Sequence, residues 1–198
     1  LIPGLLARFA SKSPNRCRLI NQDIMRVDFS QFTAPLRILG NLPYNISTPL
    51  MFKLLKDGHR FTDVHVMLQR EVANRLCSLP GDGIYGRLGV MIQATASVEL
   101  LVDVPSECFM PKPKVDSSFV RIIPKSERLA KVQSMATLAL IVRTAFAQRR
   151  KTLKNNFTNL ISAFELELNG INPQARAESI PVDKYVELAN FVARRDST

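Results

Sequence analysis

The sequence predicts an α/β fold in which a sheet with alternating helices is followed by a small helical domain. Short apolar runs of strand length alternate with helical patterns over the first half of the chain. Two further strand patterns then follow each other with too few residues between them for a helix. Beyond Pro124 the strand patterns stop and only helical spacing remains. We therefore divide the chain into a sheet domain, residues 1–124, and a helical domain, residues 125–198.

The first elements are a helix and a strand. Helical spacing is present at Leu1, Ile2, Leu5, Leu6 and Phe9. After a loop at 11–15, residues 18–22 have the pattern of a strand that ends before Asp23. An acid in this place is most often a turn residue or a helix cap, and in a nucleotide-binding sheet it can also accept a hydrogen bond from an adenine amine.

A polar tetrad follows the next predicted strand. The strand covers residues 36–40, and Asn41-Leu42-Pro43-Tyr44 comes directly after it. Thr48-Pro49 then suits the start of a helix that runs to about Lys56. The tetrad therefore lies at the carboxyl end of a strand, the edge at which open α/β sheets bind ligands.

The tetrad has the groups that activate a nucleobase amine, which is a poor nucleophile because its lone pair is delocalised. An Asn carboxamide oxygen and a carbonyl of the Leu42–Pro43 step can each accept one amine hydrogen, which favours a tetrahedral nitrogen. Pro43 restrains the backbone, and Tyr44 offers a stacking face worth ~1–3 kcal/mol per base. Such a site suits a flipped base. Taken alone, the tetrad is also typical of a strand-terminating turn.

The rest of the sheet domain is expected to end in an antiparallel hairpin. A strand over 62–69 and a short helix over 70–76 precede a loop at 80–83. Strands over 98–104 and 117–123 then pair with each other. Two prolines stiffen the segment between them, and Phe109 within it is either a core residue or a second wall for a base bound at Tyr44.

The helical domain is locally basic. Helices are predicted over 132–147, 151–164 and 182–193. The chain has a formal net charge of +10, and residues 128–164 contain seven basic residues and no acidic one. The densest group comprises Arg143, Arg149, Arg150, Lys151 and Lys154. A solvated charged face is the ordinary explanation, but so long a stretch without an acid favours contact with the phosphates of a nucleic acid.

Several classes of site have little material in this chain. The three cysteines, Cys17, Cys77 and Cys108, are widely spaced and suggest neither disulfides nor zinc, which favours a reduced, cytoplasmic setting. With two histidines, a histidine metal site or a Ser-His-Asp triad is not expected. No run reaches the roughly 18 apolar residues of a membrane span. We expect no metal and no membrane partner.

Four motifs in order carry a family resemblance. They are Asn41-Leu42-Pro43-Tyr44-Asn45-Ile46-Ser47, Gln69-Arg70-Glu71-Val72-Ala73, Tyr85-Gly86-Arg87-Leu88 and Phe109-Met110-Pro111-Lys112-Pro113-Lys114-Val115. With them the chain resembles the KsgA family of rRNA adenine N6,N6-dimethyltransferases from about Arg18 to its end. The resemblance implies a Rossmann-like methyltransferase sheet that closes with an antiparallel hairpin. It also implies S-adenosylmethionine as cofactor and, as substrate, two adjacent adenosines near the 3′ end of small-subunit rRNA in an assembling subunit.

The resemblance also implies roles for individual residues. Asn41 and the Leu42–Pro43 carbonyls orient the amine, while Tyr44 and Phe109 sandwich the adenine. The cofactor is expected to contact Asp23, Ile24 and Asn41, and the basic group of the helical domain is expected to position RNA. Gln69 and Glu71 are expected to hold loops around the site by hydrogen bonds rather than to act as bases.

One departure from the family pattern qualifies these expectations. No glycine-rich loop and no ribose-binding acid precede Asp23, so the sheet is expected to be incomplete at its N-terminus. We expect the chain to be a C-terminal portion of a longer, monomeric, bacterial enzyme that by itself binds the cofactor poorly and is inactive. Two other functions remain open from the sequence, an adenine-specific DNA methyltransferase and a non-catalytic RNA-binding assembly factor.

Overall fold

The computed structural model describes residues 3–5 and 19–197, and the chain forms two compact units, residues 1–31 and 32–198. In the first unit residues 3–5 are helical, and two short 3-10 helices follow, η1 (Ile24–Arg26) and η2 (Phe29–Gln31). The predicted helix over residues 1–9 and the loop at 11–15 lie largely or wholly outside the described residues, and so do Cys17 and Arg18.

The strand predicted over 18–22 is wrong for the described residues 19–22, which form no strand. A strand is held by ladder hydrogen bonds to a neighbour, and no described strand pairs with this segment. Asp23 instead begins η1, where its Oδ1 accepts a hydrogen bond from the Met25 N–H at 2.9 Å. The capping interpretation of Asp23 is therefore the one that its local geometry shows.

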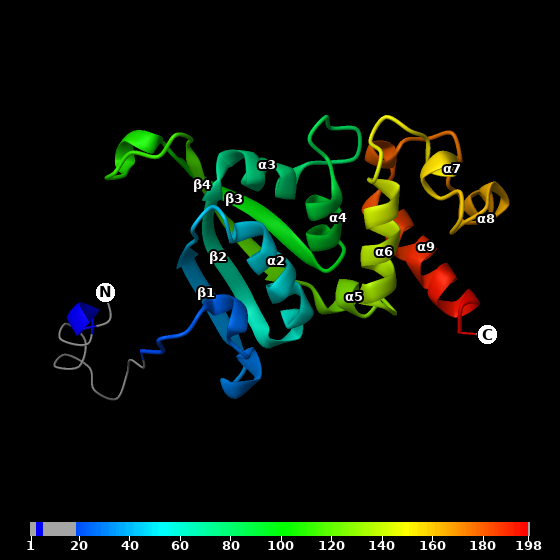
Figure 1. The fold of residues 1–198 in the computed structure, drawn as a ribbon. Coiled ribbons are helices and arrows are strands. Elements are labelled where there is room, and N and C mark those ends of the chain that lie inside the picture. The colour runs from blue at the N-terminus through cyan, green and yellow to red at the C-terminus, as the bar shows by residue number, and fades with distance from the viewer. Residues whose placement is uncertain (1–2, 6–18, 198) are drawn as a thin grey trace. The chain divides into compact units, whose positions relative to one another are not determined.

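The second unit is built on a four-stranded mixed sheet (Figure 1). Its strands are β1 (Leu36–Asn41), β2 (Phe61–Gln69), β3 (Ala96–Val104) and β4 (Ser117–Pro124), in the order β1-β2-β4-β3. β1 and β2 are parallel, whereas β4 runs antiparallel to both β2 and β3. The predicted closing hairpin is confirmed, and the β3–β4 register shifts at a bulge between Leu100 and Val102.

Helices α2 (Ser47–Lys56), α3 (Arg70–Cys77) and α4 (Arg87–Gln93) lie on one face of the sheet (Figure 1). Because side chains alternate along a strand, Val64, Val66 and Leu68 of β2 all point to one face, and each is at most 3% exposed. Leu50 and Leu54 of α2 belong to the same core. The predicted strand-helix pairs at 36–56 and 62–76 are confirmed to within one or two residues.

Sequence reasoning missed α4, and the reason is its burial. Gly89, Val90, Met91 and Ile92 are all buried, so the segment lacks the polar side from which helical periodicity is recognised. Gly89 lets α4 approach α3 closely, because a Cβ built on Gly89 would lie 2.6 Å from the Arg75 carbonyl oxygen.

We expect Gly89→Ala to lower the free energy of unfolding by about 2 kcal/mol. Alanine in a helix interior favours folding by ~1 kcal/mol relative to glycine. The clash with a main-chain oxygen outweighs this gain, since overpacking typically costs ~1–3 kcal/mol and α3 must shift as a whole. Gly83→Ala, where no atom lies within 4 Å of the added Cβ, is the matched control. Equal urea midpoints for the two variants would contradict the packing argument.

The opposite face of the sheet carries a buried carboxylate. Asp63 is 1% exposed and accepts two hydrogen bonds from the Arg37 guanidinium, at 2.6 and 2.9 Å. His65 Nδ1 lies 3.4 Å and an Arg121 nitrogen 3.6 Å from the same carboxylate. The bond from Arg37 is the largest cause of the lowered pKa of Asp63, and burial opposes it. The cluster therefore fastens β1, β2 and β4 together on this face.

The helical part contains α5 (Ser126–Leu129), α6 (Met135–Ala145), α7 (Leu153–Asn156), α8 (Ala163–Leu168) and α9 (Val182–Arg195). The helices predicted over 132–147 and 182–193 are confirmed, but the single helix predicted over 151–164 is wrong. The Thr158 hydroxyl bonds back to the Asn155 carbonyl, and Ser162 begins α8 with a reciprocal capping box to Glu165. These polar side chains end one helix and begin another.

Glu165 makes this capping box a source of pH dependence. The Ser162 N–H, followed by the Arg195 guanidinium and the Ser162 hydroxyl, lowers the pKa of Glu165 from 4.5 to about 2. Because the folded pKa is the lower one, the stabilisation is complete above about pH 4.5 and is lost as the pH falls toward 2.

Glu165→Gln keeps an acceptor oxygen but removes the charge. We expect it to lower the free energy of unfolding at pH 7 by about 1 kcal/mol, since the pair is partly exposed, and to flatten the pH dependence in the acid window. Chemical unfolding at several pH values measures both effects, with Glu167→Gln on the same helix as control. An unchanged acid slope for Glu165→Gln would refute this assignment.

A loop from the sheet region docks onto the helical part. The Tyr85 hydroxyl donates to the Ile180 carbonyl at 3.0 Å, and Gly81 N–H donates to the Glu178 carbonyl at 2.8 Å. Phe146 lies between Tyr85 and Tyr185, with ring centroids 6.2 and 5.9 Å away. Burial raises the pKa of both tyrosines well above its usual value. The predicted boundary at residue 124 stays a prediction, because residues 32–198 form one compact unit.

Candidate active site

The end of β1 carries the tetrad on a firmly held turn. Leu42 N–H donates to the Met67 carbonyl at 3.4 Å, which extends the pairing with β2 beyond Asn41. Ile46 N–H then donates to the Pro43 carbonyl at 3.1 Å, and the buried Ser47 hydroxyl donates to the Tyr44 carbonyl at 3.0 Å. The Pro43 carbonyl is therefore engaged in the turn, so the Leu42 carbonyl is the better candidate to accept an amine hydrogen.

A groove of about 300 Å³ opens beside this turn. It is lined by Asn41, Leu42, Pro43, Tyr44, Phe109, Pro111 and Pro113. Asn41 is exposed, while Tyr44 and Phe109 are half-buried. The structure thus brings together Asn41, Tyr44 and Phe109, which come from two segments more than sixty residues apart.

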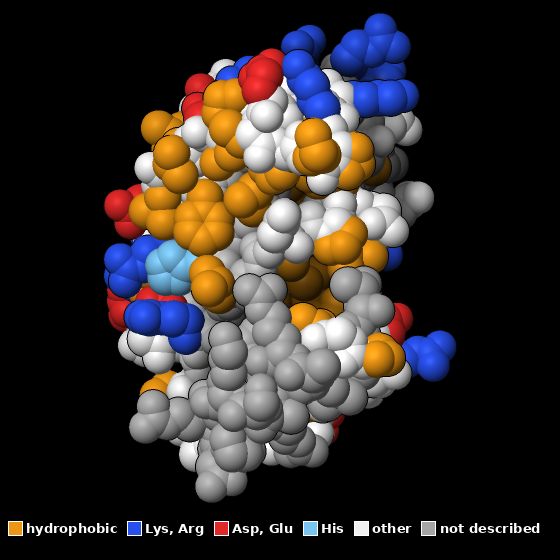
Figure 2. All heavy atoms as spheres, turned by 90° about the vertical axis from the view of Figure 1, so that its left-hand side faces the viewer, with side chains coloured by type: hydrophobic (Ala, Val, Ile, Leu, Met, Phe, Trp, Pro, Cys, Tyr) orange, Lys and Arg blue, Asp and Glu red, His pale blue; other side chains and the backbone are white. Residues whose placement is uncertain are grey.

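The surroundings of the groove are apolar. Leu39, two residues before Asn41, is 74% exposed, and Met110, next to Phe109, is fully exposed. Figure 2 faces the side on which β1 and the β3–β4 loop lie in Figure 1, and shows a broad area of hydrophobic side chains bordered by basic and acidic side chains and a histidine. A flat apolar ring would lose unfavourable contact with water by entering such a groove.

The β3–β4 loop, which supplies Phe109, is anchored at Asp116. One carboxylate oxygen of Asp116 accepts a hydrogen bond from the Ser106 N–H at 3.0 Å, and the other lies 3.0 Å from the Arg70 guanidinium. The Arg70 N–H donates to the Asp116 carbonyl, also at 3.0 Å. The next residue, Ser117, places its hydroxyl 2.9 Å from the Tyr44 hydroxyl.

The chemistry that this arrangement permits is orientation rather than proton transfer. Tyr44 is the one titratable side chain among the lining residues, and the other polar group is the Asn41 carboxamide. Glu71, expected from the sequence to hold a loop, pairs instead with Arg75 of its own helix. The groove therefore offers acceptors and aromatic faces to a planar ligand, with no acid or base among its described lining residues except the Tyr44 hydroxyl.

Asp23 and Ile24, expected to contact the cofactor, belong to residues 1–31, a unit separate from the one that carries Asn41. Asp23 is exposed, and its Oδ1 caps η1. Among the described residues no group of three or more His, Cys, Asp and Glu side chains could hold a metal ion. The described cysteines, Cys77 and Cys108, are free. Within the described part of the chain, no helix has the length and apolarity to cross a membrane.

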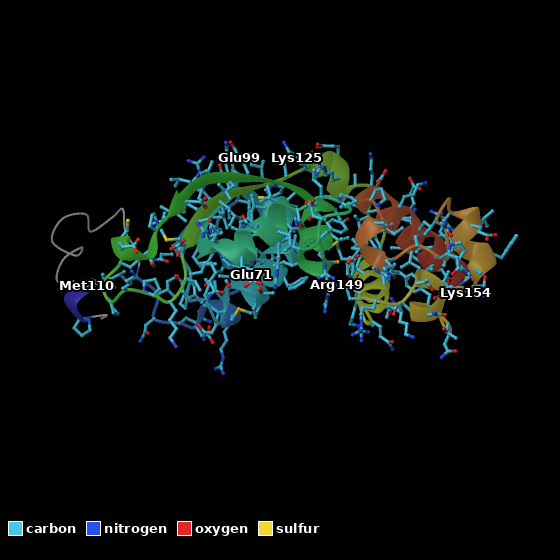
Figure 3. All side chains as sticks on the ribbon, turned by 90° about the horizontal axis from the view of Figure 1, so that it is seen from above. Glu71, Glu99, Met110, Lys125, Arg149 and Lys154 are labelled. Carbon is cyan, nitrogen blue, oxygen red and sulfur yellow. The ribbon has the colours of Figure 1, made fainter. Side chains whose placement is uncertain are left out.

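The basic residues of the helical part are exposed, but they do not form a helical face. Arg143 lies on α6 and Lys154 on α7, and Arg149, Arg150 and Lys151 occupy the turn between these helices. Arg149 also has an internal role, because its guanidinium bonds the Gly83 carbonyl and lies 3.2 Å from Glu178. Figure 3 shows Arg149 between the sheet and the helical part, with Met110 and Lys154 toward opposite ends of the unit formed by residues 32–198.

Sequence reasoning missed the supports of the groove, Arg70, Asp116 and Ser117. Arg70 lies in one of the four motifs, and Asp116-Ser117 directly follow another. Nothing in the sequence says which side chain reaches Tyr44, since the contact joins residues 73 positions apart.

Comparisons with known proteins place the chain among RNA methyltransferases. The sequence model of a family described as ribosomal RNA adenine dimethylase matches residues 3–194. Ribosomal RNA small subunit methyltransferase A of Saccharophagus degradans is 50% identical over 193 residues, 96% of this chain and 71% of that protein. The protein of the same name from Neisseria meningitidis serogroup A is 48% identical over 171 residues, 86% of this chain and 66% of that protein.

Two solved structures share the fold. A dimethyladenosine transferase from Plasmodium falciparum matches with a TM-score of 0.81 at 22% identity, covering 98% of this chain and 80% of that one. The 23S rRNA methyltransferase ErmE matches with a TM-score of 0.67 at 20% identity, covering 96% of this chain and 77% of that one.

Proposed function

Because the chain belongs to the ribosomal RNA adenine dimethylase family, we propose that the protein transfers methyl groups from S-adenosylmethionine to the N6 amines of adenosines in small-subunit rRNA. The groove that joins Asn41, Tyr44 and Phe109 at the carboxyl end of β1 carries this proposal. Its size, its two aromatic rings and its amide acceptor suit an adenine turned out of an RNA strand.

The residues of the groove orient the amine. S-adenosylmethionine, when bound, supplies a methyl group already activated on a sulfonium, so the protein's task is alignment. Asn41 Oδ1 and the Leu42 carbonyl accept the two amine hydrogens, which concentrates the nitrogen lone pair on the side away from them. Tyr44 and Phe109 hold the ring plane between them.

Of the residues proposed to contact the cofactor, Asp23 has a side chain suited to its adenine amine. Asp23 uses Oδ1 to cap η1, and its carboxylate has a second oxygen to accept a hydrogen bond from an adenine amine. Ile24, the next residue, is assigned to the same ring. Asn41 is assigned to both the cofactor and the amine. The curated relatives are longer than this chain, which spans 71% of the Saccharophagus protein and 66% of the Neisseria protein.

The substrate is proposed to be a pair of adjacent adenosines near the 3′ end of the small-subunit rRNA, in an assembling subunit. Arg143, Arg150, Lys151 and Lys154 are exposed, and we assign them to the phosphates of this RNA. The protein is proposed to act as a monomer in the cytoplasm.

The test uses the protein as its gene encodes it, with S-adenosylmethionine and three acceptors: unmethylated small subunits, the naked rRNA and double-stranded DNA. Nucleoside mass spectrometry then measures methylated adenine. Dimethyladenosine in the subunits alone is the expected result. Methylated DNA would favour a DNA methyltransferase, and tight binding of subunits without any methylated product would favour a non-catalytic assembly factor.

A further inference from the structure

We propose that the dipeptide Asp116-Ser117 sets the separation of the two aromatic walls of the groove, with Ser117 as a positioning residue for Tyr44. This inference rests on the proposed function, in which the groove holds an adenine. It concerns two residues that do not line the groove and that contact neither the base nor the cofactor in that proposal.

Ser117 is a rigid support for Tyr44. It is the first residue of β4, is fully buried, and pairs with Gln69 of β2 on one side and Val104 of β3 on the other. Strands on both sides therefore fix its main chain. Its hydroxyl lies 2.9 Å from that of Tyr44. Because a buried hydroxyl needs a hydrogen-bond partner, this contact holds the tip of the Tyr44 ring against the sheet.

Asp116 is the corresponding support for Phe109. Its carboxylate accepts the Ser106 N–H and contacts the Arg70 guanidinium, each at 3.0 Å. Ser106 begins the 3-10 helix η4 (Ser106–Cys108), which ends directly before Phe109. The turn that presents Phe109 is thus tied to the residue adjacent to Ser117. The two walls of the groove are therefore supported by adjacent residues of the main chain, at the start of β4.

The second methylation depends most on these supports. An unmodified amine has two hydrogens, so Asn41 and the Leu42 carbonyl can both orient it. The first transfer replaces one N–H bond of the amine by an N–CH3 bond, with the proton released to water, so a single hydrogen remains. Orientation then relies more on the rings that hold the base plane. A loosened Tyr44 should therefore slow the second transfer more than the first and raise the share of monomethylated adenosine.

The first experiment needs no substrate. The chain has three tyrosines, so protein labelled with 3-fluorotyrosine gives three fluorine resonances, and Tyr44→Phe assigns one of them. We expect Ser117→Ala to shift the Tyr44 resonance and leave the resonances of Tyr85 and Tyr185 in place. Ser118→Ala is the matched control, since it removes the next buried hydroxyl of β4, which bonds Asp103 instead. An unmoved Tyr44 resonance in Ser117→Ala overturns the inference.

The second experiment is a double-mutant cycle on methyl transfer. Ser117→Ala and Tyr44→Phe should each slow the second transfer about threefold to tenfold, the usual range for one hydrogen bond, with the KM for RNA within about twofold of the wild type. The double variant should be no slower than either single one. Asp116→Ala should add its own loss to that of Ser117→Ala, because it holds the other wall.

The outcomes separate this inference from the proposed function. The inference alone is overturned if the rate losses of Ser117→Ala and Tyr44→Phe multiply in the double variant. It is also overturned if Ser117→Ala and Ser118→Ala transfer methyl groups at equal rates. A wild-type protein that methylates no RNA overturns the proposed function, and the fluorine spectra then still decide whether Ser117 holds Tyr44.

Discussion

Asn41→Ala is expected to lower the rate of methyl transfer by about 100- to 1,000-fold, the loss typical when a preorganised polar group is removed from a reacting centre. The Asn41 carboxamide is the one polar side chain besides Tyr44 that lines the groove among the described residues, so no neighbour replaces its oxygen. The affinity for rRNA should stay within about twofold, because the basic residues that we assign to the RNA lie in the helical part. Single-turnover methylation and filter binding measure the two quantities.

Two further variants sharpen this test. Asn41→Asp keeps an acceptor oxygen in the same place and should lose less activity than Asn41→Ala. Asn45→Ala makes the same change on an exposed residue that does not line the groove, and it should leave the rate unchanged. An Asn41→Ala protein as active as the Asn45→Ala protein would exclude Asn41 from the reaction.

The triple variant Arg150→Ala, Lys151→Ala, Lys154→Ala is expected to weaken rRNA binding by about 100-fold at physiological salt. For every phosphate that the variant no longer neutralises, the slope of log affinity against log salt should also fall by ~0.7–0.9. The three side chains are exposed, so the effect should appear in binding and not in the free energy of unfolding.

Two single variants serve as controls for this patch. Lys184→Ala removes one positive charge elsewhere on the helical part, from an ion pair with Glu187, and should leave the salt slope unchanged. Arg149→Ala should instead reduce stability, because Arg149 joins the Gly83 carbonyl and Glu178. A triple variant that retains the wild-type salt slope would rule out the patch as the RNA-binding surface.

The family and the fold class could be predicted from the sequence, and both are confirmed by the family match and by the two solved structures. The elements that were predicted correctly from the sequence have one polar and one apolar side, as in β2 and α9. α4 was not predicted, because both of its sides are buried. The single helix predicted over 151–164 is wrong because Thr158 and Ser162 interrupt an apolar spacing that continues past them.

In the candidate site, too, some residues could be predicted from the sequence and others could not. Residues that face a ligand could be proposed from their chemistry, and the structure brings Asn41, Tyr44 and Phe109 to one groove. Their catalytic roles, and the cofactor-binding roles of Asp23 and Ile24, stay predictions. Supports such as Ser117 could not be proposed, because a serine hydroxyl has many possible partners and only the sheet register selects one. The prediction of a strand over 18–22 is wrong for a related reason. A strand needs a neighbouring strand to pair with, and the residues of the strand itself do not specify that neighbour.

If the basic residues bind RNA as proposed, the docking of Tyr85 against the helical part holds them at a constant distance from the groove. The groove and the turn that carries Arg149, Arg150 and Lys151 belong to one compact unit, and Figure 3 shows Met110 and Lys154 toward its two ends. Under that proposal, an RNA that reaches both must present its target adenosine at a fixed distance from the phosphates that these residues bind. Under the same proposal, the three-dimensional shape of the folded RNA selects the substrate, and a short oligonucleotide with the correct bases but without that shape is expected to engage one end only.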